Sequence, residues 1–270
     1  MHTAAVRWAN KFRLPSGSWV FVPTKESLRR GRYIKALVQR IWTPPSYFFH
    51  HQRGGHVEAL KSHVDGKYFV RADLQKFFNR ISRTRVTREL KPLLGYNDAR
   101  AIAVESTVPI VMDATVRHVL PFGFVQSSIL ASLCLYKSRL GRVIRELNHN
   151  PGVKVSVYVD DIIVSASTYD AAAHALGLLV EASDRSALPL NMDKLMGPAE
   201  SVVAFNVDLA EQSLLVTEQR ISHFIASYLA SDSEKRREGI LGYLKTINFQ
   251  QAEEFLDAIS ESPPDQPEED

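Results

Sequence analysis

The stretch VKVSVYVDDIIVSAS, residues 153 to 167, places two adjacent acids, Asp160 and Asp161, between two runs of mostly apolar residues. Its pattern predicts β-strands at about 153–158 and 162–167, joined by a very tight turn. An ordinary polar turn is one interpretation, since Asp side chains often bond nearby turn backbone. The turn contains no Gly or Asn, and its apolar flanks predict carboxylates crowded near a core. Crowded carboxylates repel one another and need a cation or a proton.

A third acid, Asp73 in FVRADLQKFF, directly follows an apolar strand and precedes a pair of aromatic residues. Acids at the ends of separate strands can form an oxygen cage for Mg²⁺, which prefers octahedral oxygen ligands. Two such ions about 3.5–4 Å apart serve in-line phosphoryl transfer, one activating the attacking hydroxyl and the other stabilising the leaving group. The three acids therefore predict a site for two Mg²⁺ ions, which Mn²⁺ could replace.

Four blocks of sequence, in order, resemble motifs A to D of reverse transcriptases. They are DLQKFF (73–78), LPFGFVQSSILASL (120–133), YVDD (158–161) and PLNMDK (189–194), and AFNVDL (204–209) follows where the family has a primer-grip hairpin. The resemblance implies an RNA-directed DNA polymerase, a nucleotidyltransferase. The implied fold is the α+β right-hand polymerase fold, with fingers, a palm of antiparallel sheet plus helices, and a short helical thumb.

The same resemblance divides the chain into regions. Residues 1–72 would form basic fingers partly interleaved with the palm, 73–215 the palm, 216–260 a helical thumb-like region, and 261–270 an acidic disordered tail. Apolar spacing predicts helices at 25–42, interrupted by Gly31, and at 127–148, 170–187 and 238–260, with a short strand at 201–209. Residues 43–56 are dense in Pro, Gly and aromatic residues, which predicts a loop.

The resemblance also implies a role for each matching residue. Asp73 and Asp160 would bind both metal ions with Asp161 as a supporting carboxylate, and Lys194 is a candidate general acid for the departing pyrophosphate. Phe78 is either the gate that excludes a 2′-hydroxyl or a plain core aromatic. The nucleotide would also meet the backbone amides of Leu74, Gln75, Lys76 and Phe77 and the loop containing Phe122 and Gly123.

Motif B departs from the family pattern. Phe122 stands where the family usually has Gln, and Val125 and Ser128 replace the usual prolines, while Gly123 keeps the loop pliable. These departures indicate a specialised polymerase with a dedicated template or an unusual product. They do not affect the predicted metal-binding acids.

Charge is distributed unevenly along the chain. Residues 1–100 hold 20 Lys and Arg against 6 Asp and Glu, a net of +14, and the remainder holds 13 against 24, a net of −11. So basic a block suits a polyanion such as nucleic acid, and a solvated basic surface is an equal alternative. Candidate nucleic-acid contacts are Arg29, Arg30, Arg32, Lys35 and Arg53.

The expected partners are deoxynucleotides, a DNA product and an RNA template, which we expect to be a structured noncoding RNA. The resemblance is to the bacterial branch with retron, group II intron and antiphage-defence enzymes, and we expect no added endonuclease or ribonuclease H domain within 270 residues. A homo-oligomer or a partner protein is compatible with the short fingers and thumb. The single Cys134 and the absence of a long apolar run predict a cytoplasmic protein with no membrane contact.

Two alternative functions stay open from the sequence. The first is template-independent or protein-primed DNA synthesis by the same site, which the altered motif B allows. The second is an inactive nucleic-acid-binding scaffold subunit. Three crowded acids argue against the scaffold, because a scaffold has no need for them.

Overall fold

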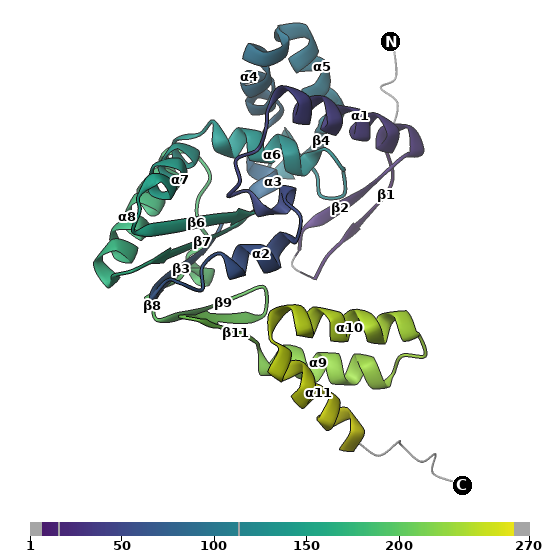
Figure 1. The fold of residues 1–270 in the computed structure, drawn as a ribbon. Helices are drawn as coiled ribbons and strands as arrows, with labels where there is room; N and C mark the ends of the chain where they lie inside the picture. The colour runs from purple at the N-terminus through teal and green to yellow at the C-terminus, as the bar shows by residue number, and fades with distance from the viewer. Residues whose placement is uncertain (1–6, 16, 113, 262–270) are drawn as a thin grey trace.

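The computed structural model describes residues 7–15, 17–112 and 114–261 of the chain. Its centre is a four-stranded antiparallel sheet with the strand order β6-β7-β3-β8 (Figure 1). The strands are β3 (Tyr68–Asp73), β6 (Val153–Tyr158), β7 (Asp161–Ala166) and β8 (Met196–Ala199). Antiparallel sheets combined with separate layers of helices confirm the predicted α+β class.

Both faces of the central sheet are buried, because successive side chains of a strand point to opposite faces. Val70 and Ala72 of β3 enter the larger hydrophobic core, whereas Phe69 enters a second core on the other face. Helices α7 and α8 cover the first face, and α2 and a three-stranded sheet share the second core. These elements are α2 (Gly55–Lys61), α7 (Arg139–His149), α8 (Tyr169–Arg185), β9 (Ser201–Ala204), β10 (Val207–Ala210) and β11 (Ser213–Val216).

The predicted hairpin with the double acid is present. Tyr158 of β6 pairs with Asp161 of β7, so Val159 and Asp160 alone form the turn. Strand β7 also pairs with β3, in a register that sets Asp161 opposite Asp73. The sheet itself therefore aligns two segments of the chain that carry the predicted acids.

Two further β-hairpins, β1–β2 and β4–β5, have no counterpart among the predicted elements. Helix α1 confirms the predicted helix but continues through Gly31. Close packing requires Gly at this position, because a Cβ there would collide with the side chain of Gln126. The elements of this part are β1 (Trp8–Arg13), β2 (Trp19–Pro23), α1 (Lys25–Ile41), α3 (Phe77–Arg80), α4 (Arg83–Leu94), α5 (Tyr96–Ser106), β4 (Val108–Met112) and β5 (Thr115–Val119).

Two segments that were predicted as single helices are each divided by a polar residue. The helix expected at 127–148 consists of α6 (Ser127–Tyr136) and α7, and the Ser138 hydroxyl between them caps α7. The helix expected at 238–260 consists of α10 (Glu234–Ile247) and α11 (Phe249–Glu261), with the Asn248 side chain accepting a bond from the first turn of α11. Such caps satisfy helix N–H groups that have no intrahelical partner, so a new helix can begin there.

The predicted strand at 201–209 is also divided. It is the hairpin β9–β10, whose turn residues Phe205 and Asn206 both have positive φ. The predicted loop at 43–56 contains a short 3-10 helix, η1 (Phe49–His51), and ends where α2 begins at Gly55. In the predicted tail, Glu261 ends α11, and residues 262–270 lie outside the described part of the chain.

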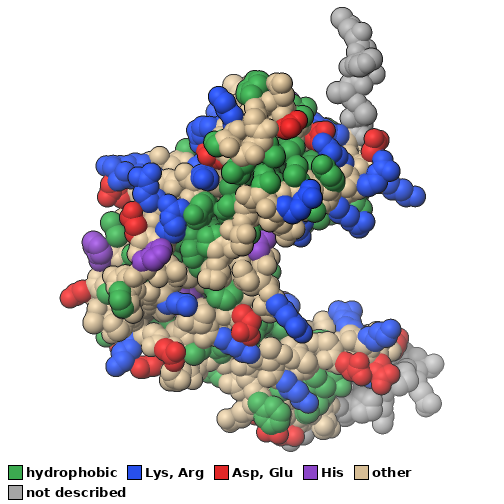
Figure 2. All heavy atoms as spheres, turned by 45° about the horizontal axis from the view of Figure 1, so that its top comes forward, with side chains coloured by type: hydrophobic (Ala, Val, Ile, Leu, Met, Phe, Trp, Pro, Cys, Tyr) green, Lys and Arg blue, Asp and Glu red, His purple; other side chains and the backbone are tan. Residues whose placement is uncertain are grey.

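The C-terminal helices α9 (Glu218–Leu229), α10 and α11 pack together below the sheets, as Figure 1 shows. Figure 2 shows that the surface is hollowed between this helical part and the body above it, with Lys and Arg side chains on both sides. Among the described residues, no helix combines the length and apolar character that crossing a membrane requires.

Candidate active site

The structure brings the three predicted acids together at one edge of the central sheet. Asp73 is the last residue of β3 and is 7% exposed, and Asp161 opposite it begins β7. The backbone carbonyl of Asp160 accepts a hydrogen bond of 2.9 Å from the amide of Leu74, which joins the turn to the end of β3. Residues far apart in sequence thus present three carboxylates at one place.

The carboxylates disturb one another electrostatically. Burial, and then the neighbouring charges of Asp161 and Asp73, raise the pKa of Asp160 to about 6. Burial also raises the pKa of Asp161, against the opposing effect of Arg71. A raised carboxyl pKa means that the fold disfavours the charged form, and a cation would offset the part of this effect that comes from Asp161 and Asp73.

Arg71 is a site residue that the sequence analysis missed. Its guanidinium donates to Asp161 Oδ1 from Nη2 at 3.0 Å and from Nε at 3.3 Å, and its Nη1 donates to the Val203 carbonyl of β9 at 3.1 Å. The ion pair is largely shielded from solvent, so it fixes the Asp161 carboxylate in orientation. The sequence spacing could have revealed Arg71, because it precedes Asp73 by two residues and therefore shares its face of the strand.

Lys194 is the predicted residue that reaches this site from a distant segment. It ends the short helix η2 (Met192–Lys194), and its Nζ donates to Asp73 Oδ1 at 3.2 Å. The backbone carbonyl of Asp73 also accepts a 2.7 Å bond from the Asn191 amide, which positions this turn. The Lys194 side chain is 55% exposed, so its ammonium group is free to exchange Asp73 for another anionic partner.

Within the described residues, no group of three or more His, Cys, Asp or Glu side chains is arranged to hold a metal ion. Two internal cations already contact the carboxylates, Lys194 at Asp73 and Arg71 at Asp161. The donor chemistry still suits Mg²⁺, because the acids offer only oxygen ligands. Burial and the two neighbouring acids raise the pKa of Asp160 in spite of the opposing effect of Lys194.

The segment after Asp73 corrects one expectation. The amides of Leu74 and Gln75 already donate to the carbonyls of Asp160 and Pro189, each at 2.9 Å, so they do not face a triphosphate. Lys76 has φ of 52° and leads into α3, whose first N–H groups have no intrahelical partner. The amides of Lys76 and Phe77 therefore stay candidates for phosphate contact.

Phe78 and Phe122, the two predicted aromatic residues at the nucleotide, contact each other. Their rings meet edge to face, with centroids 4.7 Å apart, and Phe78 is 6% exposed. Gly123 has φ of 98°, and a Cβ there would collide with the backbone of Phe21 in β2. The structural need for Gly123 is thus close packing against β2, rather than the pliability expected from the sequence.

A cavity of 520 Å³ lies between the hairpins β1–β2 and β4–β5 and helix α3, and Lys76 lines it. Lys11 and Arg13 of β1 line it, and Lys11 also lies over the ring of Trp19 at 4.9 Å. These two basic residues are missing from the predicted set, although their spacing of two in WANKFR puts them on one strand face. The cavity has the size and positive charge that a nucleoside triphosphate requires.

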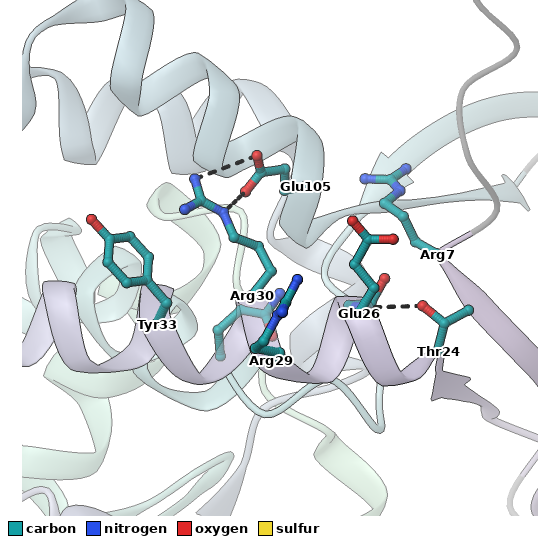
Figure 3. A pocket seen from close by; sticks show the side chains of 9 residues that line it. Arg7, Thr24, Glu26, Arg29, Arg30, Tyr33 and Glu105 are labelled. Carbon is teal, nitrogen blue, oxygen red and sulfur yellow. Dashed lines mark hydrogen bonds and ion pairs between the residues drawn. The ribbon is translucent and has the colours of Figure 1, made fainter.

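Two of the predicted basic contacts lie at a second cavity, which none of the three acids lines. Arg29 and Arg30 line a second cavity, of 590 Å³, over the start of α1, and Arg30 is paired with Glu105 at 2.7 Å (Figure 3). Arg32 and Arg53 are exposed, and Lys35 is half-buried. A role for these five residues in nucleic-acid binding stays a prediction.

Residues 29–202 match the model of the family described as reverse transcriptase (RNA-dependent DNA polymerase), which is more than half of the chain. No curated protein matches the sequence.

Three solved structures are similar at low identity. Telomerase from Candida albicans with a fragment of telomeric RNA has a TM-score of 0.55 and 9% identity, over 93% of this chain and 59% of that chain. Apo telomerase from Candida tropicalis has a TM-score of 0.53 and 10% identity, over 86% and 48%. A foamy viral protease-reverse transcriptase with double-stranded DNA has a TM-score of 0.47 and 19% identity, over 94% and 39%.

The chain thus spans three fifths or less of the length of these three structures, and at such identities the telomerase likeness shows the fold alone. It confirms the predicted right-hand polymerase fold. The family match covers the segments that contain Asp73, Asp160 and Asp161, and it confirms the predicted family. The chain belongs to the reverse transcriptase family.

Proposed function

We propose that this chain catalyses RNA-directed DNA synthesis from deoxynucleotides. The observation that carries the proposal is the meeting of Asp73, Asp160 and Asp161 at one sheet edge. A basic cavity is lined by Lys76, three residues after Asp73. A scaffold gains nothing from holding a carboxylate whose pKa is raised by burial and by neighbouring acids, whereas a nucleotidyl-transfer site needs carboxylates gathered at a cation position.

Asp73 and Asp160 are the residues that would hold Mg²⁺, with Mn²⁺ as a substitute. When bound, such ions supply charge stabilisation and an activated 3′-hydroxyl. Asp161 accepts a hydrogen bond from Arg71, which leaves it less free to bind a metal ion and agrees with a supporting role. Lys194 can give the proton on Nζ to the departing pyrophosphate, because its ammonium already lies beside Asp73 and is partly exposed.

The nucleotide would enter through the cavity between the hairpins β1–β2 and β4–β5. Lys11 and Arg13 would meet the triphosphate, which is more direct than the contacts first expected from Leu74 and Gln75. Phe78 lies against Phe122 and would exclude a 2′-hydroxyl by its bulk. A Phe78→Ala variant should therefore incorporate ribonucleotides at a rate much closer to that for deoxynucleotides.

The motif resemblance supports further proposals on the roles of the chain regions, the template and the partners. Residues 1–72 would act as fingers, 73–215 as palm and 216–260 as thumb. The template would be a dedicated structured noncoding RNA, as in retrons or bacterial antiviral defence. A second copy of the chain or a partner protein would add to the surface that binds the nucleic acid. The altered motif B around Phe122 supports an unusual template or product. A cytoplasmic location stays a prediction.

The test is deoxynucleotide incorporation by the purified protein with its co-purifying RNA, with Mg²⁺, with Mn²⁺ and with a chelator. The Asp160→Ala, Asp161→Ala double variant should be inactive, whereas Asp184→Ala, on the exposed side of α8, should match the wild type. Sequencing the product identifies the template. Product made without RNA would favour untemplated or protein-primed synthesis, and inactivity of folded, RNA-loaded protein would favour the scaffold.

A further inference from the structure

The catalytic turn contains a backbone conformation that its own residues do not favour. Val159 has φ of 59°, in the left-handed region, where a β-branched residue is a genuine outlier. Such strain costs on the order of 1–3 kcal/mol and persists only where the surrounding structure enforces it. The contacts around Val159 should therefore show what holds the turn, and with it Asp160, in place.

One side chain bonds directly to this turn. The amide of Val159 donates to Nδ1 of His50 at 3.0 Å, across 109 residues of sequence. On the other side of its ring, His50 Nε2 lies 2.8 Å from the hydroxyl of Ser132 in α6. His51 Nε2 lies 3.0 Å from the same hydroxyl. The imidazole of His50 thus bridges α6 and the turn.

A count of protons fixes the direction of these bonds. Ser132 has one hydroxyl proton, which it donates to the Ser128 carbonyl at 2.9 Å. Its oxygen must then accept from Nε2–H of both His50 and His51. A neutral His50 with its proton on Nε2 has a lone pair on Nδ1, which is what the Val159 amide requires.

The surroundings keep His50 in this neutral form. Burial, followed by the effect of His51, lowers the pKa of His50 to about 3, against a smaller opposing effect of the Val157 backbone. The backbone next to His50 also contacts the strand before the turn, since the Val157 amide donates to the Tyr47 carbonyl at 2.7 Å and Phe48 forms a parallel bridge with Val157. Residues 47–50 therefore run beside the end of β6 as a support.

We propose that His50 is a positioning residue for the polymerase site, which holds the Val159–Asp160 turn through its Nδ1 so that the Asp160 carboxylate faces Asp73. This inference rests on the proposed function. His50 does not touch substrate or metal in this role. It acts through the backbone of the turn, and Ser132 of α6 fixes its tautomer.

Two substitutions separate the two nitrogens of the ring. In His50→Asn, the side-chain oxygen takes the place of Nδ1 and can accept from Val159, whereas the bond to Ser132 is lost. In His50→Gln, the amide takes the place of Nε2 and keeps Ser132, whereas the acceptor at the turn is lost. His51→Gln is the matched control, since His51 bonds the same hydroxyl.

We expect His50→Gln to lower kcat by about tenfold or more with KM for deoxynucleotide nearly unchanged, because a misplaced carboxylate weakens transition-state stabilisation. His50→Asn should restore most of kcat, and His51→Gln should retain it. Equal kcat in the Asn and Gln variants, or an equal loss in His51→Gln, would overturn the inference. Each kcat is referred to the folded fraction measured by circular dichroism.

A second measurement needs neither activity nor a variant. Nitrogen NMR of the wild-type protein should find His50 protonated on Nε2 and unprotonated on Nδ1, with the Val159 amide slow to exchange. A proton on Nδ1 would overturn the inference. If the wild type has no polymerase activity, the proposed function fails, while the NMR result still decides whether His50 holds the turn.

Discussion

The hairpins β6–β7 and β9–β10 both have two-residue turns but are stabilised differently. Each has a two-residue turn, Val159–Asp160 in the first and Phe205–Asn206 in the second, and both contain non-glycine residues with positive φ. Asn206 is a residue type that adopts the left-handed region readily, whereas Val159 is among the least suited. The β9–β10 turn is thus partly specified by its own sequence, and the β6–β7 turn is enforced by His50 and its neighbours.

The largest effect is expected for Asp160→Asn in the β6–β7 turn, which should lower polymerase activity and raise the free energy of unfolding. Loss of the carboxylate should lower polymerase activity by at least about 1,000-fold, equivalent to about 4 kcal/mol. The fold raises the pKa of Asp160 to about 6 from 3.8, so the charged form destabilises the native state above pH 6. The neutral amide should raise the free energy of unfolding by about 1–3 kcal/mol at pH 7 in metal-free buffer.

Urea unfolding and single-turnover incorporation check both parts of this prediction, with Asp184→Asn on the exposed side of α8 as control. An Asp160→Asn protein that is inactive but less stable than the wild type would show that the crowded carboxylate stabilises the fold. That result would remove the electrostatic argument for a cation at this turn.

Acid should weaken the β6–β7 hairpin more than the β9–β10 hairpin. The buried His63 links the strands of β6–β7, with Nε2 2.8 Å from the Ser156 hydroxyl and Nδ1 2.8 Å from the Ser165 hydroxyl. Burial lowers its pKa to about 3 from 6.5. The unfolded chain therefore binds the proton more readily, and the free energy of unfolding should fall as pH drops below 6.5.

The slope for this one residue is up to about 1.4 kcal/mol per pH unit between pH 6.5 and 3. Urea unfolding at several pH values measures it, and His63→Gln should show a shallower slope. Amide exchange at pH 5 should increase first in β6 and β7, because β9 and β10 contain no histidine. An unchanged slope in the His63→Gln variant would assign the acid sensitivity to other groups.

Exchanging residue types between the turns should act in opposite directions. Asn206→Val should lower the free energy of unfolding by about 1–2 kcal/mol, because a branched side chain is disfavoured at positive φ. Val159→Asn should raise it by less than about 1 kcal/mol, since relief of strain is offset by lost packing of the partly buried Val159. Urea unfolding of both variants measures the pair, and a stability loss in Val159→Asn would show that packing outweighs strain there.

The sequence predicts that Asp73, Asp160 and Asp161 meet, and it can do so because the signals are local. Alternation along β6 and β7 and the apolar strand before Asp73 indicate a hairpin and a strand end, and the structure contains both. Arg71 could have been found in the same way, from its spacing of two from Asp73. Element breaks were harder to predict, because apolar periodicity continues past the caps at Ser138 and Asn248.

The support of the turn could not be predicted from sequence. His50 lies in a segment whose Pro, Gly and aromatic content indicates only a loop, and it contacts Val159 across 109 residues. No local periodicity relates these two positions. The β4–β5 hairpin was missed for another reason, since Val111 and Val116 are 75% and 65% exposed and do not follow the burial pattern of a strand.

The smallest expected effect concerns contact between the two hairpins. The rings of Tyr158, just before the catalytic turn, and Phe205, in the other turn, lie 5.3 Å apart at 72°. A double-mutant cycle with Tyr158→Leu and Phe205→Leu should give a coupling of about 0.5–1 kcal/mol in urea unfolding. Tyr228→Leu in place of Phe205→Leu should give none, because Tyr228 packs on Phe255. A coupling of zero for the first pair would mean that the hairpins fold independently and that the catalytic turn depends on His50 without help from β9–β10.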